Sequence, residues 1–403
     1  MKGIYLDNNS TTRIDDGVKA AMDRYDTEFF GNPNSLHMFG AQAREGLRKA
    51  VDQIYAALGA DDEDDVIVTA GATESNNTVL KSLLRRDRNG KLIGDRRGRL
   101  GVVISSVEHP AISVTCEYLE SQGIPVTVVP LNEDGIITPE NLDKCIDPEK
   151  TALVSVMWAN NETGLVNPIK ELAEVAHRKG VYFHTDAVQA VGKIPINVQE
   201  VGVDMLSASA HKFHGPKGVG LLYINHRCKW LSEYEGYFTP LLHGGEQMAN
   251  RRAGTINVPG VVGMGAAIEL ADKHARDPEV MGKMIRLRNK LEDYLLTIPG
   301  VKVIGRREIR TPNTILASFR GVEGEAMLWD LNQFGIAAST GSACASESLQ
   351  ANPTFDAMAV DPELSHTGIR FSLSHYTTDE EIDRTIEAVG KAVTRLRNIS
   401  GIY

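Results

Sequence analysis

Short β-rich runs alternate with helical patterns between about residues 65 and 225. The run DDVIVTA leads into NNTVLKSLL, LGVVISS precedes AISVTCEYLESQG, and TALVSVMW precedes IKELAEVAHRKG. Strands and helices that alternate in this way predict an α/β fold, with a mainly parallel sheet covered by helices on both faces. Because such sheets bind ligands beyond the carboxyl ends of their strands, we expect a functional site there.

The remainder of the chain predicts a second, smaller unit. Residues 269–298 have a helical pattern, and the runs VKVIG, NTILASF, IAAST and GIRFSLS that follow are typical of short strands. Thr378 and Glu381 have the spacing of a capping box at the start of a final helix. The expected division is a large domain of residues 15–265 and a small α+β domain of residues 1–14 and 266–403.

The composition narrows the class of protein. The 403 residues carry 43 basic and 53 acidic side chains, and a net charge of -10 disfavours non-specific binding to nucleic acid. No apolar run approaches the roughly 20 residues of a membrane span, and the N-terminus lacks the apolar region of a signal peptide. None of the four cysteines forms a C-x-x-C pair, which gives a metal site little support and fits a reducing compartment. We therefore expect a cytoplasmic protein without a metal.

Two predicted strand ends carry residues suited to an anion or a flat ring. In VTAGATES, Ala72 and Thr73 follow Gly71 at the expected start of a helix, where free N–H groups bind anions. Helix capping by the hydroxyl groups is an equally good interpretation. In SSVEHP, His109 could stack on an aromatic cofactor or move a proton, although a structural histidine remains an alternative.

Two further strand ends carry opposite charges. Asp186 in YFHTDAVQA could hold a cationic ring nitrogen, or it could cap a helix. Lys212 follows an apolar strand in SASAHKFHGPKG, a costly place for a lysine, and is suited to a Schiff base with an aldehyde. A lysine, an acid and a phosphate nest together indicate pyridoxal phosphate. A sulfur-relay protein that used Cys344 alone would leave Lys212 and Asp186 unexplained.

With these motifs in view, the chain resembles the NifS/IscS-type cysteine desulfurases of the class V aminotransferases, which are fold-type I enzymes. The resemblance runs nearly from end to end. It is carried, in the family's order, by YLDNNSTT, FGNPNSLH, GATESNN, VEHPA, NNETG, HTDAVQAVGK, SAHKFHGPKG, RAGT, STGSACAS and IRFSLS. The segment around Cys344 resembles the first of the two desulfurase classes.

The resemblance implies conversion of L-cysteine to L-alanine, with the sulfur left on Cys344 as a persulfide. It implies a homodimer with shared active sites, and a sulfur-acceptor protein such as an iron–sulfur scaffold, although transfer of sulfur toward tRNA thiolation is an alternative. An aminotransferase or a selenocysteine-selective lyase on the same fold is a rival interpretation. An aminotransferase would not need Cys344.

The resemblance also implies roles for individual residues. Lys212 would bind the cofactor aldehyde, Asp186 would pair with the pyridinium nitrogen, and His109 would stack on the ring and help to transfer protons. Cys344 would accept the sulfur of the substrate, and it would be part of a mobile segment at about residues 339–360. The remaining positions are those at the ring hydroxyl (Gln189 and Asn161), at the phosphate (Ala72, Thr73, Ser209, His211 and the partner-contributed Thr255) and at the substrate (Arg370 at its carboxylate, and Asn161).

Two segments depart from the family pattern. In HGGEQMANRRAGT, Glu246 stands where the family often has glycine, which puts the shape of that loop in doubt. The charged segment 85–101 is longer than usual and is expected to be a solvated surface loop without an assigned function.

Overall fold

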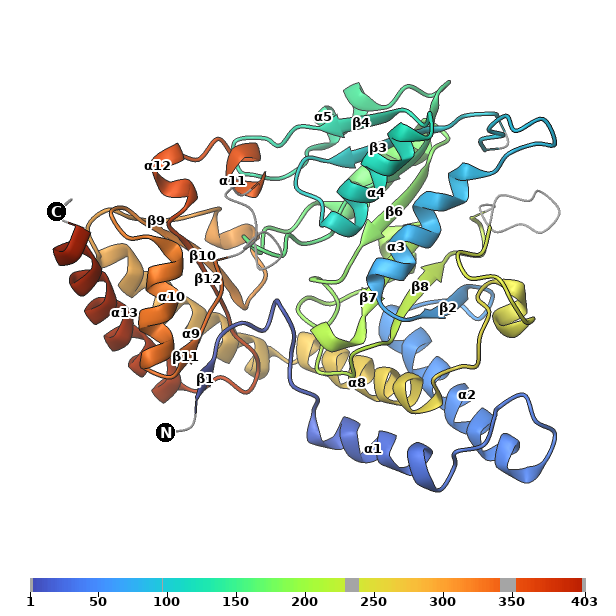
Figure 1. The fold of residues 1–403 in the computed structure, drawn as a ribbon, viewed down its shortest axis with the longest axis horizontal. Coiled ribbons are helices and arrows are strands. Elements are labelled where there is room, and N and C mark those ends of the chain that lie inside the picture. The colour runs from blue at the N-terminus through green and yellow to red at the C-terminus, as the bar shows by residue number, and fades with distance from the viewer. Residues whose placement is uncertain (1–2, 96, 229–238, 341–352, 401–403) are drawn as a thin grey trace.

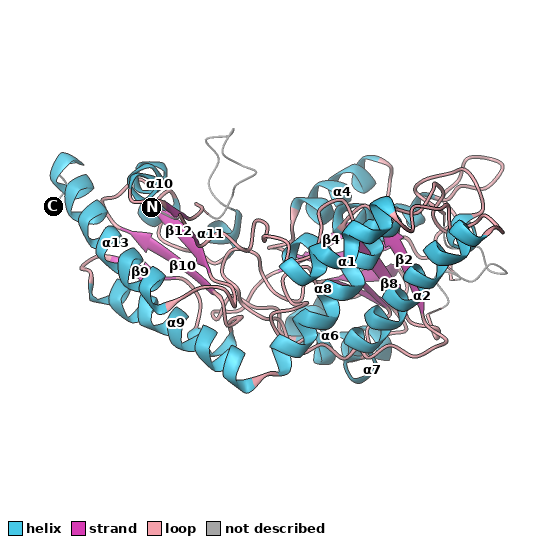
Figure 2. Ribbon diagram, turned by 90° about the horizontal axis from the view of Figure 1, so that it is seen from below, coloured by secondary structure: helices cyan, strands magenta, loops and turns pink. Residues whose placement is uncertain are grey.

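The structure is a computed structural model that describes residues 3–95, 97–228, 239–340 and 353–400. Figures 1 and 2 show two lobes, each built on its own β-sheet with helices packed around it. The amino-terminal segment runs along the junction between the lobes before it enters the larger one (Figure 1).

The larger lobe contains a seven-stranded sheet in the order β2-β8-β7-β6-β5-β3-β4. Strands β3 to β7 pair in parallel, whereas β8 runs antiparallel to both of its neighbours. The prediction of a mainly parallel sheet in an α/β fold is therefore confirmed. The strands are β2 (Asp65–Thr69), β3 (Gly101–Ser105), β4 (Val126–Val129), β5 (Thr151–Ser155), β6 (Tyr182–Asp186), β7 (Met205–Ser209) and β8 (Gly220–Ile224).

Alternate residues of these strands enter two separate hydrophobic cores, because successive side chains point to opposite faces of a sheet. Val103, Val154 and Phe183 pack with the helices of one face, and Val102 and Leu153 pack with those of the other. The first face is covered by α2 (Met38–Leu58), α5 (Pro139–Cys145), α6 (Ile169–Arg178), α7 (Val198–Val201) and α8 (Val258–Arg276), and α1 (Asp16–Thr27) packs outside α8. The second is covered by α3 (Ala72–Lys81) and α4 (Pro110–Ser121).

The smaller lobe contains an antiparallel sheet in the order β12-β10-β9 and a parallel pair of β1 with β11. Its strands are β1 (Ile4–Tyr5), β9 (Val301–Val303), β10 (Thr314–Phe319), β11 (Ile336–Ala337) and β12 (Gly368–Ser372). Its helices are α9 (Pro278–Thr297), α10 (Gly324–Gln333), α11 (Pro353–Ala357), α12 (Pro362–Ser365) and α13 (Asp379–Ser400). The capping box at α13 is confirmed, because Thr378 and Glu381 exchange hydrogen bonds of 3.0 and 3.2 Å.

The expected boundary between the two domains can be compared with the two lobes. Ile4 and Leu6 belong to the core of the smaller lobe, and the expected boundary at residues 265 and 266 falls inside the continuous helix α8. The division into domains remains a prediction.

Among the described residues, no helix combines the length and the apolar character that crossing a membrane requires.

Most described residues of the charged segment 85–101 are exposed, as expected of a surface loop, but two of its charged side chains are buried. Asp95 and Arg99 are both buried, and their side chains form an ion pair of 2.5 Å. Arg99 also donates to the carbonyl oxygens of Pro148 (3.2 Å) and Gly180 (2.8 Å). A buried ion pair with these extra hydrogen bonds fastens the segment to the edge of the larger lobe.

The contact between α2 and α8 gives a test of this packing. A Cβ atom added to Gly265 would lie 2.6 Å from the Cα atom of Ala50, so neither backbone can yield locally. We expect Gly265→Val to lower the free energy of unfolding by about 1–3 kcal/mol, as overpacking does. Chemical denaturation monitored by circular dichroism measures this change.

The matched control is Gly282→Val in α9, where an added Cβ would meet no atom within 4 Å. We expect this variant to stay within about 0.5 kcal/mol of the wild type. Equal stabilities for the two variants would contradict the close approach of α8 to α2.

Candidate active site

The carboxyl ends of β6 and β7 place an acid and a lysine side by side. Asp186 is the last residue of β6, and it pairs in register with Ser207 of the parallel strand β7. The chain then passes Ser209 into η2 (Ala210–Lys212), a single 3₁₀ turn that ends at Lys212. Because the strands are parallel, both ends open on the same edge of the sheet, as the sequence predicted.

The buried carboxylate of Asp186 is held from two sides. Asn76 of α3 donates to its Oδ2 atom (2.7 Å), and the backbone N–H of Val188 donates to Oδ1 (3.0 Å). Sequence reasoning missed Asn76, although it lies within the motif GATESNN. Asn76 is completely buried and its Oδ1 atom has no hydrogen-bond partner among the described residues. A polar residue on the buried face of a helix is the signal that could have identified it.

The ring of His109 lies close to the charges of both Asp186 and Lys212. His109 caps α4, and its Nδ1 atom accepts from the N–H of Ala111 (3.1 Å). Burial lowers its pKa, the charge of Asp186 raises it, and the charge of Lys212 lowers it. The ring is therefore neutral near pH 7, and because Nδ1 accepts a hydrogen bond, its proton is on Nε2.

The amine of Lys212 contacts the amino-terminal segment. Its Nζ atom donates to the carbonyl oxygens of Asn9 (2.7 Å) and Ser10 (2.9 Å). The motif YLDNNSTT contains both residues, but their pairing with a lysine two hundred positions away depends on the fold and could not be predicted from the pattern.

A helix, α3, begins where the sequence predicted an anion-binding turn. Gly71 is its N-cap and Thr73 lies inside the first turn, so the alternative that Thr73 serves as the N-cap is not supported. The hydroxyl of Ser209 lies 3.5 Å from the position of a Cβ atom built on Gly71, which brings it beside Ala72. The Nδ1 atom of His211 is 3.1 Å from Oγ1 of Thr11, and burial lowers the pKa of this histidine to about 4.

Arg370 lies in β12 and closes the site from the smaller lobe. Its guanidinium donates to the carbonyl oxygen of Asn161 (2.9 Å), to Asp7 (2.8 Å) and to the hydroxyl of Ser10 (2.7 Å). Since Ser10 also accepts from Lys212, the expected carboxylate-binding arginine and the cofactor lysine share a neighbour. Gln189 is buried nearby and donates from Nε2 to the carbonyl oxygen of Asn9 (3.0 Å).

One of the expected site residues, Thr255, is not part of this arrangement. Thr255 is exposed and makes no side-chain hydrogen bond within the described chain, while Arg252 in the same segment pairs with Glu74 of α3 (2.9 Å). Cys344 lies outside the described residues. The segment that leads to it begins at Ser339, which forms an antiparallel bridge with Arg370.

The assembled groups fit pyridoxal phosphate. They comprise an amine for its aldehyde, a fixed carboxylate for its ring nitrogen, a neutral imidazole and a helix start flanked by hydroxyl groups. The residues that would hold the group are Lys212, Asp186, His109, Gln189, Ala72, Thr73 and Ser209.

Glu108 precedes His109 and is buried behind the site. Its Oε1 atom accepts from the hydroxyl of Ser105 and from the N–H of Met157 (2.8 Å), whereas Oε2 has no partner among the described residues. Burial raises the pKa of Glu108 to about 8, against the opposing effect of these hydrogen bonds. The carboxyl group is therefore protonated at neutral pH.

Comparison with known proteins gives a consistent result. The family described as Aminotransferase class-V matches residues 4–385. The cysteine desulfurase of Enterobacter agglomerans is 45% identical over 401 residues, which cover 99% of this chain and 95% of that protein. Cysteine desulfurase NifS of Azotobacter vinelandii is 43% identical over 401 residues, again 99% of this chain and 95% of that protein.

Solved structures share the fold. A NifS-like protein superposes with a TM-score of 0.85 at 36% identity and covers 98% of this chain and 99% of its own. The structure of SspA in complex with cysteine gives a TM-score of 0.77 at 28% identity, over 93% of this chain and all of the other (100%).

The protonated state of Glu108 predicts how stability depends on pH. Because its pKa is raised in the folded state, Glu108 contributes to the free energy of unfolding. This contribution is complete below pH 4.5, the pKa in the unfolded chain, and is lost as the pH rises to about 8. We expect Glu108→Gln, which cannot ionise, to gain thermal stability relative to the wild type between pH 5 and pH 9. Thermal unfolding of both proteins across this range measures the difference. A difference in thermal stability that is the same at every pH would contradict this prediction. The control is Glu149→Gln, at an exposed glutamate.

Proposed function

This chain belongs to the class-V aminotransferase family, and from that premise we propose how its own residues act in a cysteine desulfurase. The protein is a pyridoxal-phosphate-dependent cysteine desulfurase that takes sulfur from L-cysteine. When bound, the cofactor supplies an electron sink that stabilises negative charge on the substrate carbon. In this proposal, Lys212 binds its aldehyde, and Asp186, kept in place by Asn76, keeps its ring nitrogen protonated.

Substrate binding is assigned to Arg370. A buried guanidinium is suited to bidentate recognition of a carboxylate. The substrate carboxylate would take the place that Asp7 and the carbonyl oxygen of Asn161 occupy around it. The ring of His109 lies close to the charges of Asp186 and Lys212. Because it is neutral and has its proton on Nε2, it can exchange a proton with the substrate.

The sulfur step is assigned to Cys344. The thiolate of Cys344 attacks the sulfur of the substrate, and the carbon–sulfur bond breaks with its electron pair going to carbon. That carbon takes a proton to give L-alanine, and Cys344 keeps the sulfur as a persulfide. A thiolate is the competent nucleophile, so Cys344 must lose its proton on approach.

The observation that carries this assignment is the bridge between Ser339 and Arg370. The backbone N–H of Ser339 donates to Arg370 (3.2 Å), and that of Arg370 donates back to Ser339 (2.6 Å). Cys344 follows Ser339 by five residues, so its Cα atom can lie at most about 17 Å from a point beside the substrate-binding arginine. An aminotransferase would have no use for a cysteine in this position.

A homodimer is the proposed assembly, with Thr255 completing the phosphate site of the partner. Its support is an exposed apolar segment that runs from the connection after α1 into the first turn of α2. Leu36 is 96% exposed, Met38 66% and Phe30 64%, and the rings of Phe30 and Phe39 lie 5.5 Å apart. Apolar side chains gathered in this way mark an association surface.

The acceptor of sulfur is proposed to be a protein, such as a scaffold for iron–sulfur clusters, and the place of work is proposed to be the cytoplasm. The net charge of -10 supports a protein acceptor over direct contact with nucleic acid.

The proposed sulfur step is tested by Cys344→Ala in the enzyme loaded with cofactor. We expect this variant to keep the yellow colour and the spectral response to L-cysteine. We also expect it to form no persulfide and to produce alanine at least roughly 100-fold more slowly, as loss of a catalytic group does. Mass spectrometry of the Cys344 peptide after L-cysteine should show one added sulfur in the wild type only.

Cys145→Ala is the matched control, because Cys145 is a partly buried cysteine that packs against the core of the larger lobe. Lys212→Ala should lose the coloured form, and Lys217→Ala, which changes an exposed lysine five residues later, should retain it. Sulfur transfer that survives in Cys344→Ala would remove Cys344 from the mechanism.

The dimer is tested by Leu36→Asp. Two chains of 44.0 kDa give a wild-type species of about 88 kDa, twice the chain mass, in light scattering coupled to size exclusion. We expect Leu36→Asp to shift this species toward the monomer, because a carboxylate is costly to bury in an apolar interface. Ile399→Asp, which changes a 68% exposed residue at the end of α13, should remain dimeric. A monomeric wild type would contradict the proposal.

A further inference from the structure

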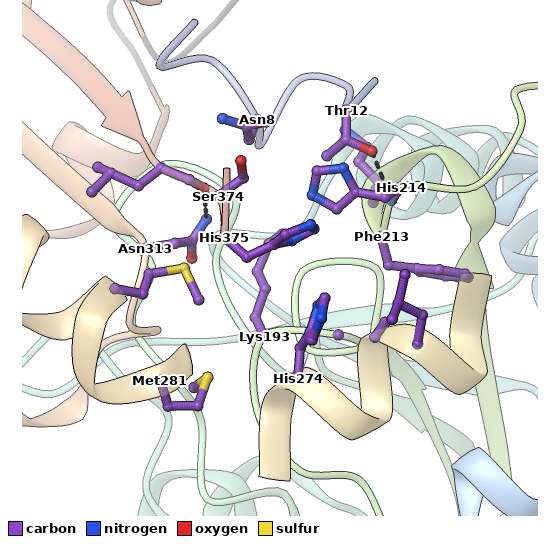
Figure 3. Close-up of a pocket in the computed structure, with 16 residues that line it drawn as sticks. Asn8, Thr12, Lys193, Phe213, His214, His274, Met281, Asn313, Ser374 and His375 are labelled. Carbon is purple, nitrogen blue, oxygen red and sulfur yellow. Dashed lines mark hydrogen bonds between the residues drawn. The ribbon is translucent and has the colours of Figure 1, made fainter. Parts of the chain in front are cut away.

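A second lysine is buried close to Lys212 and has no part in the steps described above. Lys193 ends the motif HTDAVQAVGK, and only 6% of its surface is exposed. It lines a pocket at the junction of the two lobes together with Lys212 (Figure 3). Lysine is almost never fully buried unless its amine has a partner, so this position calls for a specific explanation.

The surroundings of Lys193 make its burial costly. Burial lowers the pKa of its amine far below the usual range, and the positive charges of Lys212 and Arg370 act in the same direction. The pocket also contains His214, which follows η2, His274 of α8 and His375, which follows β12. None of the pocket-lining residues carries a carboxylate that would compensate the amine. The position of Lys193 is therefore not explained by an ion pair inside this pocket.

The amine instead bonds to a residue of the active site. Nζ of Lys193 donates to Oε1 of Gln189, four residues earlier in the chain. The other end of the same amide, Nε2, donates to the carbonyl oxygen of Asn9 (3.0 Å). That carbonyl oxygen also accepts from Nζ of Lys212 (2.7 Å). Three hydrogen bonds thus connect the two lysines through Gln189 and Asn9.

The direction of these bonds fixes the amide of Gln189. A carbonyl oxygen only accepts, so the NH₂ group of Gln189 must face Asn9 and its oxygen must face Lys193. Lysine can donate to that oxygen in either charge state. Without Lys193, the oxygen of the amide would be buried without a donor, which is unfavourable, and the amide would turn or move.

We propose that Lys193 is a positioning residue for the cofactor site, which holds Gln189 and, through Asn9, the amine of Lys212 in their working orientation. This inference rests on the proposed role of Lys212 as the cofactor lysine. Lys193 contacts neither the substrate nor the cofactor in this proposal. It acts through Gln189, whose NH₂ group it keeps directed at the site.

The test uses Lys193→Met, which keeps the length and the apolar stem of the side chain but removes the donor. In the enzyme loaded with pyridoxal phosphate, we expect the cofactor to dissociate about 10-fold faster, the effect of one lost buried hydrogen bond. The visible circular dichroism band, which reports how the bound cofactor is oriented, should change in amplitude. Lys217→Met, at an exposed lysine, should change neither quantity.

A double-mutant cycle with Gln189→Leu separates this role from a general effect on folding. If Lys193 acts through Gln189, the double variant should release the cofactor no faster than Gln189→Leu alone. Additive effects of the two substitutions on the release rate would overturn the proposal, as would an unchanged rate and dichroism band in Lys193→Met. If Lys193→Met does not fold, Gln189→Leu and Gln189→Glu still test the connection. Both should alter the dichroism band, and an unchanged band in both would overturn it.

The proposed function fails in a different way. A Lys212→Ala variant that keeps the visible band would refute the assignment of the cofactor lysine. If the wild type is yellow and active, and Lys193→Met has an unchanged release rate and dichroism band, only the role of Lys193 is refuted.

Discussion

The carbonyl oxygen of Asn9 is the acceptor on which the site depends. It accepts from Lys212 and Gln189 in the larger lobe, while the side chain of Asn9 bonds to Thr314 (2.9 Å) and Asn313 (3.0 Å) in the smaller one. A turn of the amino-terminal segment therefore connects both lobes to the lysine that would hold the cofactor. Displacement of either lobe would disturb the position of that amine, because one residue bonds to both.

The parallel sheet supplies the second constraint. Because β6 and β7 are neighbours in register, Asp186 and Lys212 leave the sheet at the same edge, and His109 reaches them from the end of β3. This geometry requires no special feature beyond strand order. It explains why the acid, the lysine and the imidazole could be grouped from the sequence, where each follows an apolar run. Their roles remain proposals that the variants above address.

The limits of sequence reasoning follow from distance along the chain. Asn76 is 110 positions from the carboxylate that it holds, and Asn9 is 203 positions from Lys212, so only the folded topology shows these pairs. Asp95 and Arg99 were missed for another reason. A run of charges is normally solvated, and nothing in its pattern distinguishes the one pair that the fold buries. Lys193 lies in the same motif as Asp186 and Gln189, and nothing in the pattern shows that its amine is buried.

The bridge between Ser339 and Arg370 has a kinetic consequence. In the proposed mechanism, Cys344 is attached to the chain five residues from Ser339, so its thiol would react as a group of the same molecule, at an effective concentration set by chain length. For so short a connection this concentration is of millimolar order, so the attack on the substrate sulfur is independent of how dilute the enzyme is. The same limit on distance would apply to the transfer of sulfur from Cys344 to the acceptor. If the proposed acceptor is a protein thiol, it would have to come within that short radius and would therefore dock close to Arg370.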